Sequence, residues 1–350
     1  MAFSVDLTRA NGFGPLPRLL EERAGEHAFL KTFESLKIPY AVIDSPQMPI
    51  PLSAMVALFD RSARILGDRA FGLEVGQIMA ANAYGLWRQY GATAPYLATA
   101  IRRLCATLPM HQTGAGLSLN RTGERYIWRY SIRPFEASVQ THADHVIGPM
   151  LLLCRQYLGL DWEPEAIELN YKRDADAGLI EEKLQAPVFF EKPGIGIVLK
   201  PTDLSEPLKT ALAQNRPPIT MREVVAEGVI ADQPEPARSI GALVALRLLD
   251  GRADIDGTAE MAGLSVQGLQ RRLRQGGFSY REIVNVARQK RAEALLQDTE
   301  LSMVDIALSL GYEDHATFSR AFRRQVGCPP STYREATSRT RQNRQPLRAD

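Results

Sequence analysis

The sequence AEMAGL at 259–264 recurs as ALSLGY at 307–312, and LQRRLR at 269–274 recurs as FSRAFR at 318–323. The first pair is separated by 48 residues and the second by 49, so the second copy has one extra residue in its turn. Each copy predicts a helix, a turn and a second helix, the arrangement in which the second helix enters the major groove of DNA. Gly263 and Gly311 fall in the two turns, where a residue that accepts positive φ allows a sharp change of direction.

The second helix of each copy has an apolar face and a polar face. Two apolar residues spaced four apart share the inward face, Leu269 with Leu273 and Phe318 with Phe322. Gln, Arg and Ser side chains can pair with base edges and with phosphates. The polar residues that point elsewhere are Gln267, Gln270, Arg271, Arg274, His315, Ser319, Arg320 and Arg323. One copy alone is also compatible with an ordinary helical hairpin, whereas two copies in register favour DNA binding.

The charge distribution supports the same interpretation. The chain has 350 residues and a net charge of +2, but 237–350 contains 18 basic and 13 acidic residues, a net of +5. All of these basic residues except Lys290 are arginines, whose planar guanidinium makes bidentate contacts to phosphate and guanine. A basic surface that is merely solvated remains the alternative.

The C-terminal third resembles AraC/XylS-type transcription regulators. Their C-terminal signature is matched by Ala307, Gly311-Tyr312, Phe318, Phe322-Arg323, Gly327, Pro329-Pro330 and Tyr333-Arg334, and their linker helix by Arg288, Arg291-Ala292 and Leu295-Leu296. The resemblance covers about 237–335 and implies two helix-turn-helix motifs joined by a linker helix. It places the base contacts at Gln267, Gln270 and Arg271 and at His315, Ala316, Ser319 and Arg320, where Ala316 offers only a methyl group.

The first copy departs from this pattern in its first helix. Gly257 and Thr258 occupy the positions that Asp305 and Ile306 hold in the second copy. Glycine costs ~1 kcal/mol relative to alanine inside a helix. We therefore expect this helix to be less stable than its counterpart.

The N-terminal part predicts an α+β fold with a small antiparallel sheet. Apolar residues recur with helical spacing at 52–66 and 96–108, and 141–158 predicts one long buried helix. Segments 117–120 and 126–132 alternate around a turn and predict a hairpin, as do 187–190 and 195–199, while 167–171 predicts a further strand.

Prolines and the lack of a sustained apolar period mark 205–236 as a linker, with a short helix at 221–227. The domains expected are therefore 1–204 for effector binding or oligomerisation, 237–335 for DNA binding, and 336–350 as a basic, disordered tail.

The N-terminal domain resembles the arabinose-binding-like domain that some AraC-type regulators carry. The resemblance rests on Ile50-Pro51-Leu52-Ser53, Gly67-Asp68 with Phe71-Gly72-Leu73, and Leu160-Asp161-Trp162-Glu163-Pro164. Trp87, Arg88 and Tyr90 depart from the small or apolar residues usual after Gly85-Leu86. A cation beside two aromatic rings could bind a carboxylate effector, and a cluster on the helix surface is the alternative.

Other combinations of residues carry weaker signals. Cys105, Cys154 and Cys328 are too widely spaced for a CxxC ligand pair, and packed thiols are expected. His142 and His145 have a spacing that a metal could use, but no further ligand beyond Asp144 completes the set, so we expect no metal or other cofactor. Catalytic signatures such as GxSxG and HExxH are missing from the sequence, and no stretch approaches the ~20 apolar residues of a membrane span.

These patterns predict a cytoplasmic, sequence-specific DNA-binding regulator, most simply an activator. Its expected partners are an operator in double-stranded DNA, RNA polymerase, a small-molecule effector and a second copy of the chain. Two alternatives stay open: an enzyme domain fused to the DNA-binding module, and an N-terminal domain that only dimerises.

Overall fold

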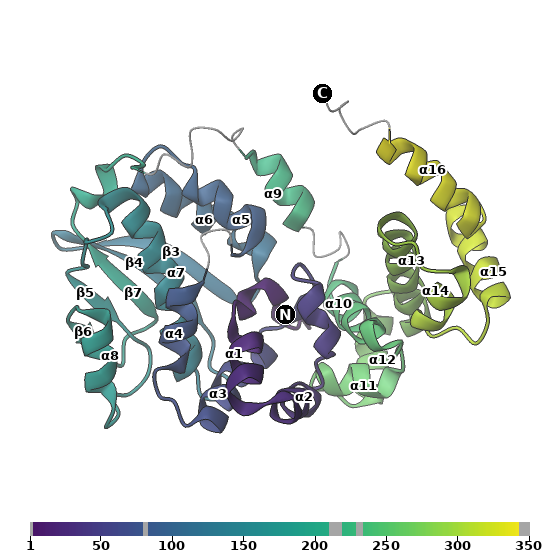
Figure 1. The fold of residues 1–350 in the computed structure, drawn as a ribbon, viewed down its shortest axis with the longest axis horizontal. Helices are drawn as coiled ribbons and strands as arrows, with labels where there is room; N and C mark the ends of the chain where they lie inside the picture. The colour runs from purple at the N-terminus through teal and green to yellow at the C-terminus, as the bar shows by residue number, and fades with distance from the viewer. Residues whose placement is uncertain (1–2, 80–82, 210–218, 229–233, 343–350) are drawn as a thin grey trace. The chain divides into compact units, whose positions relative to one another are not determined.

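Alternating residues at 115–132 form a β-hairpin in the computed structural model (Figure 1). The structure describes residues 3–79, 83–209, 219–228 and 234–342. It divides the chain into two units, one of Asp6–Ile230 and one of Ala231–Asp350 together with Met1–Val5. The predicted tail at 336–350 overlaps the last helix, and 343–350 lie outside the described residues, so the predicted domain boundaries stay a prediction.

The first unit contains a five-stranded sheet in the order β3-β4-β7-β5-β6. All neighbouring strands are antiparallel except β5 and β6, which run parallel. A separate antiparallel pair, β1 with β2, brings Leu7 opposite Pro51. The strands are β1 (Leu7–Arg9), β2 (Pro49–Pro51), β3 (Ala115–Thr122), β4 (Arg125–Ile132), β5 (Ala166–Glu168), β6 (Val188–Phe189) and β7 (Ile195–Leu199).

The hairpin predicted from 117–120 and 126–132 is confirmed, whereas the second predicted hairpin is wrong. β6 and β7 both form, but β5 lies between them and pairs with each. The backbone N–H of Ile167 donates to Pro187 O at 2.8 Å, and that of Leu169 donates to Phe189 O at 2.8 Å. Strand periodicity predicts the strands themselves but not their partners, because a third short strand can enter between two neighbours in sequence.

Helices pack against the sheet and contribute most of the core of this unit. The predicted helix at 52–66 forms with these bounds, and its apolar stripe, including Met55 and Phe59, is buried. The helices are α1 (Leu16–Ala24), α2 (Glu26–Ser35), α3 (Leu52–Leu66), α4 (Phe71–Ile78), α5 (Gly85–Ala92), α6 (Leu97–His111), α7 (Gln140–Leu158), α8 (Ala177–Leu184) and α9 (Met221–Gly228).

Helix α7 is the long buried helix predicted at 141–158, and it packs against both the sheet and α4. A Cβ on Gly76 would lie 2.3 Å from His145 O, and a Cβ on Gly148 would lie 2.3 Å from the carbonyl carbon of Gly76. Glycines therefore let the backbones of α4 and α7 touch. Trp128 and Tyr130 of β4 pack in the same core as Ile147 and Met150 of α7.

All the regular secondary structure in the described residues of the second unit is helical. Its helices are α10 (Ala237–Arg247), α11 (Ile255–Met261), α12 (Val266–Gln275), α13 (Tyr280–Asp298), α14 (Met303–Ser309), α15 (His315–Val326) and α16 (Pro330–Gln342). The predicted pair of helix-turn-helix motifs joined by a longer helix is thus confirmed, as is the α+β class of the first unit. Across the described parts of both units, no helix combines the length and apolar character needed to cross a bilayer.

Candidate functional site

The first helix-turn-helix motif consists of α11 and α12. Asp254 and Ser265 cap the two helices, accepting from the backbone N–H groups of Gly257 at 2.8 Å and Gly268 at 3.1 Å. Gly263 in the turn has φ +65°, which confirms the conformation expected there. Leu269 and Leu273 are buried on the inward face of α12. The polar face of this helix is consequently left for solvent or DNA.

The second motif consists of α14 and α15, and it repeats these features. Ser302 and Asp314 cap the helices, and Gly311 has φ +72°. Phe318 and Phe322 are buried with ring centroids 5.8 Å apart, and Tyr333 of α16 packs edge-on against Phe322 at 5.5 Å. Aromatic packing therefore fixes α15 against the last helix, α16.

The predicted DNA-binding side chains lie on the second helix of each motif, and most of them are exposed. Arg271 and Arg320 occupy corresponding positions in the two repeats, and both are exposed. Arg320 donates to the hydroxyl of Thr317 at 3.0 Å, which orients its guanidinium along α15. Ser319 is half-buried, whereas the other predicted residues are exposed: Gln267, Gln270, Arg274, His315, Ala316 and Arg323.

Helix α13 joins the two motifs and contacts α10, α15 and α16. Ser279 and Glu282 form a capping box at its start, with Ser279 N donating to Glu282 Oε2 at 2.8 Å. Arg288 donates to Gly311 O at 3.1 Å and stacks over Tyr312 at 4.6 Å. The connecting helix is therefore tied directly to the turn of the second motif.

Gly257 of α11 has a packing role that sequence reasoning missed. A Cβ at this position would lie 2.1 Å from a terminal nitrogen of Arg247. The Arg247 guanidinium lies against the helix there and is ion-paired with Asp254, the N-cap of α11. Thr258 beside it is buried, and its hydroxyl is 2.7 Å from that of Tyr280. Gly257, which differs from the second repeat, therefore leaves room for the Arg247 guanidinium, and Thr258 provides a polar contact with the Tyr280 hydroxyl.

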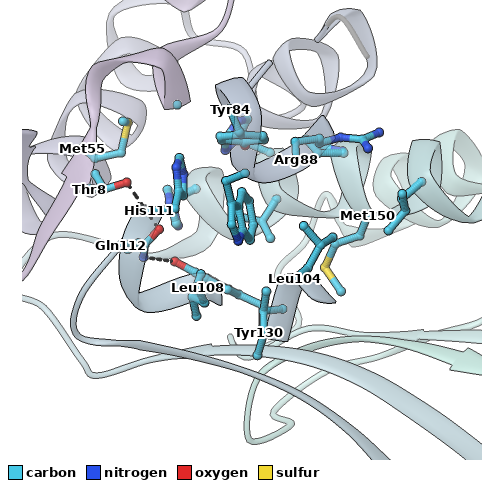
Figure 2. Close-up of a pocket in the computed structure, with 18 of the residues that line it drawn as sticks. Thr8, Met55, Tyr84, Arg88, Leu104, Leu108, His111, Gln112, Tyr130 and Met150 are labelled. Atoms are coloured by element: carbon cyan, nitrogen blue, oxygen red, sulfur yellow. Dashed lines mark hydrogen bonds between the residues drawn. The ribbon is translucent and has the colours of Figure 1, made fainter. Parts of the chain in front are cut away.

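The first unit encloses a pocket beneath α5, between α6, α7 and β4 (Figure 2). Its cavity volume, measured as the space open to the centres of water molecules, is about 80 Å³. In Figure 2, Thr8 and Met55 lie at one end, while Arg88 and Met150 lie at the other. Gln112 links Thr8 and Tyr130, accepting from Thr8 Oγ1 at 3.3 Å and donating to the Tyr130 hydroxyl at 2.6 Å.

Two of the three predicted effector-binding residues line this pocket. Trp87 stacks on His111 with ring centroids 4.5 Å apart and 6° between their planes. Arg88 is only 3% exposed, so it does not belong to a cluster on the helix surface. Tyr90 lies outside the pocket lining, and Arg103 stacks over its ring at 4.7 Å.

Arg88 is a buried cation with no counter-ion among the described residues. Neither Nη1 nor Nη2 has a hydrogen-bond partner there, and no Asp or Glu lines the pocket. Burial lowers the pKa of its guanidinium to about 10, so it still carries its charge at neutral pH. An uncompensated buried charge is costly, and buried charges in proteins are normally paired.

Three histidines also line the pocket, and burial favours their neutral forms. Burial lowers the pKa of His111 to about 3 and that of His142 to about 4, and it moves the pKa of His145 well below its usual value. The Nδ1 atom of each ring lacks a hydrogen-bond partner among the described residues. Sequence spacing singled out His142 and His145, but nothing local in the sequence signalled that His111 joins them.

The described residues contain no group of three or more His, Cys, Asp or Glu that could hold a metal ion. Burial also raises the pKa of the Cys105 thiol to about 11 and raises that of Cys154. A reactive cysteine needs a lowered pKa, so neither residue has the environment of an activated nucleophile.

Helix α9 ends shortly before the second unit and packs against the start of α5. Glu227 Oε2 accepts from the backbone N–H of Leu86 at 2.9 Å, and Glu227 Oε1 accepts from Gln47 Nε2 at 3.4 Å. Arg9 donates to Glu227 O at 3.0 Å. The helix that carries Trp87 and Arg88 is therefore bonded to the last helix before the DNA-binding unit.

Comparisons with known proteins cover both units. Residues 27–208 match the family model described as the arabinose-binding domain of AraC transcription regulators, and residues 258–336 match a helix-turn-helix domain model. The chain is 25% identical over 314 residues to the ornithine utilization regulator of Pseudomonas aeruginosa, covering 87% of this chain and 90% of that protein. It is 39% identical over 89 residues to the regulatory protein SoxS of Escherichia coli K12, covering 25% and 81% respectively.

Among solved structures, the chain is similar to the transcriptional regulator CdpR of Pseudomonas aeruginosa, with a TM-score of 0.37 and 24% identity over 76% of this chain and 87% of that one.

Proposed function

The chain belongs to the AraC family of transcription regulators, and from this premise we propose that a small molecule bound beneath α5 controls how its two helix-turn-helix motifs engage an operator. The protein is a DNA-binding transcription regulator. The observation that carries the effector role is the buried, unpaired guanidinium of Arg88 in an otherwise largely apolar pocket. A pocket with a few converging polar groups is the usual form of a small-molecule site.

We propose that the base contacts are made by the exposed side chains of α12 and α15, with Arg271 and Arg320 as equivalent members of the two repeats. The remaining predicted contacts stay part of this proposal: Gln267, Gln270, Arg274, His315, Ala316, Ser319 and Arg323. Their exposure and the arginine excess of 237–350 support it.

The regulator is further proposed to act in the cytoplasm as a homodimer that activates transcription through RNA polymerase. Family membership supports this part of the proposal. Light scattering of the purified chain at several concentrations tests the dimer, and transcription from the bound promoter in vitro tests activation.

The effector role is tested by operator binding with and without a metabolite. Thermal-shift screening of the full chain supplies candidates, and the name of the ornithine utilization regulator suggests amino-acid catabolism as one source. A true effector should change operator affinity at least tenfold, a coupling of ~1.4 kcal/mol. Arg88→Ala should remove this response while leaving operator affinity without ligand nearly unchanged. A response unaltered in Arg88→Ala would reject the pocket as the effector site.

A further inference from the structure

The pocket beneath α5 has one charged group, and that group is positive. Arg88 is 3% exposed, and both its terminal nitrogens lack partners among the described residues. The acidic residue nearest in sequence to the pocket histidines, Asp144, is ion-paired with Arg69 at 2.5 Å and does not line the pocket. The described residues of the pocket therefore supply no anion to balance this charge.

The geometry of the two unpaired Arg88 nitrogens limits which class of anion would fit. Two terminal nitrogens on one planar guanidinium match the two oxygens of a carboxylate in a bidentate pair. A phosphate carries more charge and more oxygens, and would require further donors at the Arg88 end. Among the described residues, the groups that interact electrostatically with the Arg88 guanidinium are Tyr84, Cys154 and Tyr157, and none of them is a second cation.

The rest of the pocket suits an apolar, planar body. Trp87 and His111 form a stacked pair, and Trp128 and Tyr130 lie on the opposite, β4 side. Aromatic rings prefer offset-stacked or edge-on contacts with other rings. The Nε1–H groups of Trp87 and Trp128 lack partners among the described residues, so either of them can donate to a polar substituent on the ligand.

The same lining disfavours amines. An ammonium group in this pocket would meet the Arg88 cation and no carboxylate from the described residues. A ligand that carries both a carboxylate and an ammonium would leave the second charge unpaired, which is costly in a buried site.

We propose that the effector is a small monocarboxylate with an apolar, preferably aromatic, body and no amino group, held by a bidentate pair with Arg88. This rests on the proposed role of the pocket as the effector site. It assigns a ligand class that differs from the basic amino acid in the name of the ornithine utilization regulator.

Matched probes test the ligand class on the purified full chain. Calorimetric titration compares phenylacetate with phenylacetamide, its uncharged counterpart, and with phenethylamine, its cationic one. Octanoate and octanamide repeat the comparison with a linear body. At least one carboxylate should bind on the order of a hundredfold more tightly than its amide, because the amide leaves the buried cation unpaired. Equal binding of acid and amide, tighter binding of the amine, or no binding of either acid at millimolar concentration would overturn the proposal.

Substitutions of Arg88 test whether this residue causes the preference for acid over amide. Arg88→Met, which removes the charge at similar length, should abolish the preference for acid over amide, whereas Arg88→Lys should retain part of it. Arg64→Met, at an exposed arginine of the same unit, is the matched control and should bind like wild type. A preference that persists in Arg88→Met would overturn the proposal, and if that variant fails to fold, the acid and amide comparison on wild type still decides.

A second measurement separates the ligand class from the effector role. Operator affinity is measured with and without the tightest-binding acid. Tight, Arg88-dependent binding that leaves operator affinity unchanged supports the ligand class and rejects the effector role. An operator response to a metabolite of another class, with none of the acids binding, rejects the ligand class and leaves the effector role standing.

Discussion

Arg271 and Arg320 occupy the same position in the two repeats, and each is exposed on its recognition helix. If they read bases as proposed, replacing either with alanine should cost ~1–3 kcal/mol of operator affinity and relax specificity at one base pair, as loss of a bidentate arginine contact does. Gel-shift titrations against operators randomised at single positions measure this effect.

Arg324, exposed on the same helix as Arg320, serves as the comparison. Loss of an arginine that contacts only phosphate should weaken binding to all sequences alike and reduce the salt slope by about 1. If Arg320→Ala weakened binding to operator DNA and to random DNA equally, the proposed role of Arg320 in base recognition would be rejected.

The three pocket histidines make the first unit sensitive to acid. Burial holds their pKa values below 6.5 in the folded state, so the unfolded chain binds more protons below that pH. Their stabilisation is therefore complete above pH ~6.5 and is lost as the pH falls toward 4, at ~1.4 kcal/mol per pH unit for each histidine. Asp144 opposes this trend, because burial raises the pKa of its carboxyl to about 6 despite the charge of Arg69.

His142→Gln tests this dependence. The slope of unfolding free energy between pH 6 and 5 should fall by ~1.4 kcal/mol per pH unit relative to wild type. His27→Gln, at an exposed histidine of the same unit, is the matched control. Trp87, Trp128 and Trp162 all lie in the first unit, so tryptophan fluorescence follows its unfolding separately. Equal slopes in His142→Gln and wild type would contradict the prediction.

At the scale of elements, α11 shows how packing can offset helix propensity. Gly257→Ala should stabilise the second unit less than a Gly→Ala change in open space, because the new Cβ displaces the Arg247 guanidinium from its pair with Asp254. Gly241→Ala in α10 is the control, since its Cβ would meet only Ile283 at 3.8 Å, and it should stabilise the unit by ~0.5–1 kcal/mol. Thermal unfolding followed by circular dichroism measures both. A Tm for Gly257→Ala as high as that for Gly241→Ala would refute the packing role.

The contact of α9 with α5 offers a route from the pocket to the second unit. Glu227→Ala removes the acceptors for the Leu86 N–H and for Gln47 Nε2, and so weakens the attachment of the end of α9 to α5. We expect this variant to bind ligand nearly as wild type does but to lose most of the effect of ligand on operator affinity. Arg222→Ala, at an exposed residue of the same helix, should keep the full effect. A wild-type response in Glu227→Ala would show that coupling takes another path.

At the scale of the whole molecule, helix α13 sets the spacing of the two motifs. Its 19 residues span ~28 Å at 1.5 Å each, comparable with the ~34 Å between major grooves one turn apart. One chain should therefore protect roughly two turns on one face of the duplex. Hydroxyl-radical footprinting of the operator measures this, and protection limited to a single groove would contradict it.

The parts that could be predicted from the sequence are those specified locally. The repeat around Gly263 and Gly311 predicted both motifs, because each turn and its apolar pairs lie within a few consecutive residues. The pocket could not be predicted in full, because His111, His142 and Arg88 come from three helices whose packing depends on distant contacts. Trp87 and Arg88 were detectable as departures from a family pattern, but their burial was not.

The unpaired charge of Arg88 has a further consequence, for the lifetime of the regulator in a cell. A ligand that binds only the folded chain stabilises it by ~2.7 kcal/mol at a hundred times its Kd. Proteases remove unfolded chains, so a shift of this size changes abundance several-fold. We expect the copy number of the regulator to rise with its own signal, so that cells deprived of the effector hold few copies and respond to its return only after new synthesis.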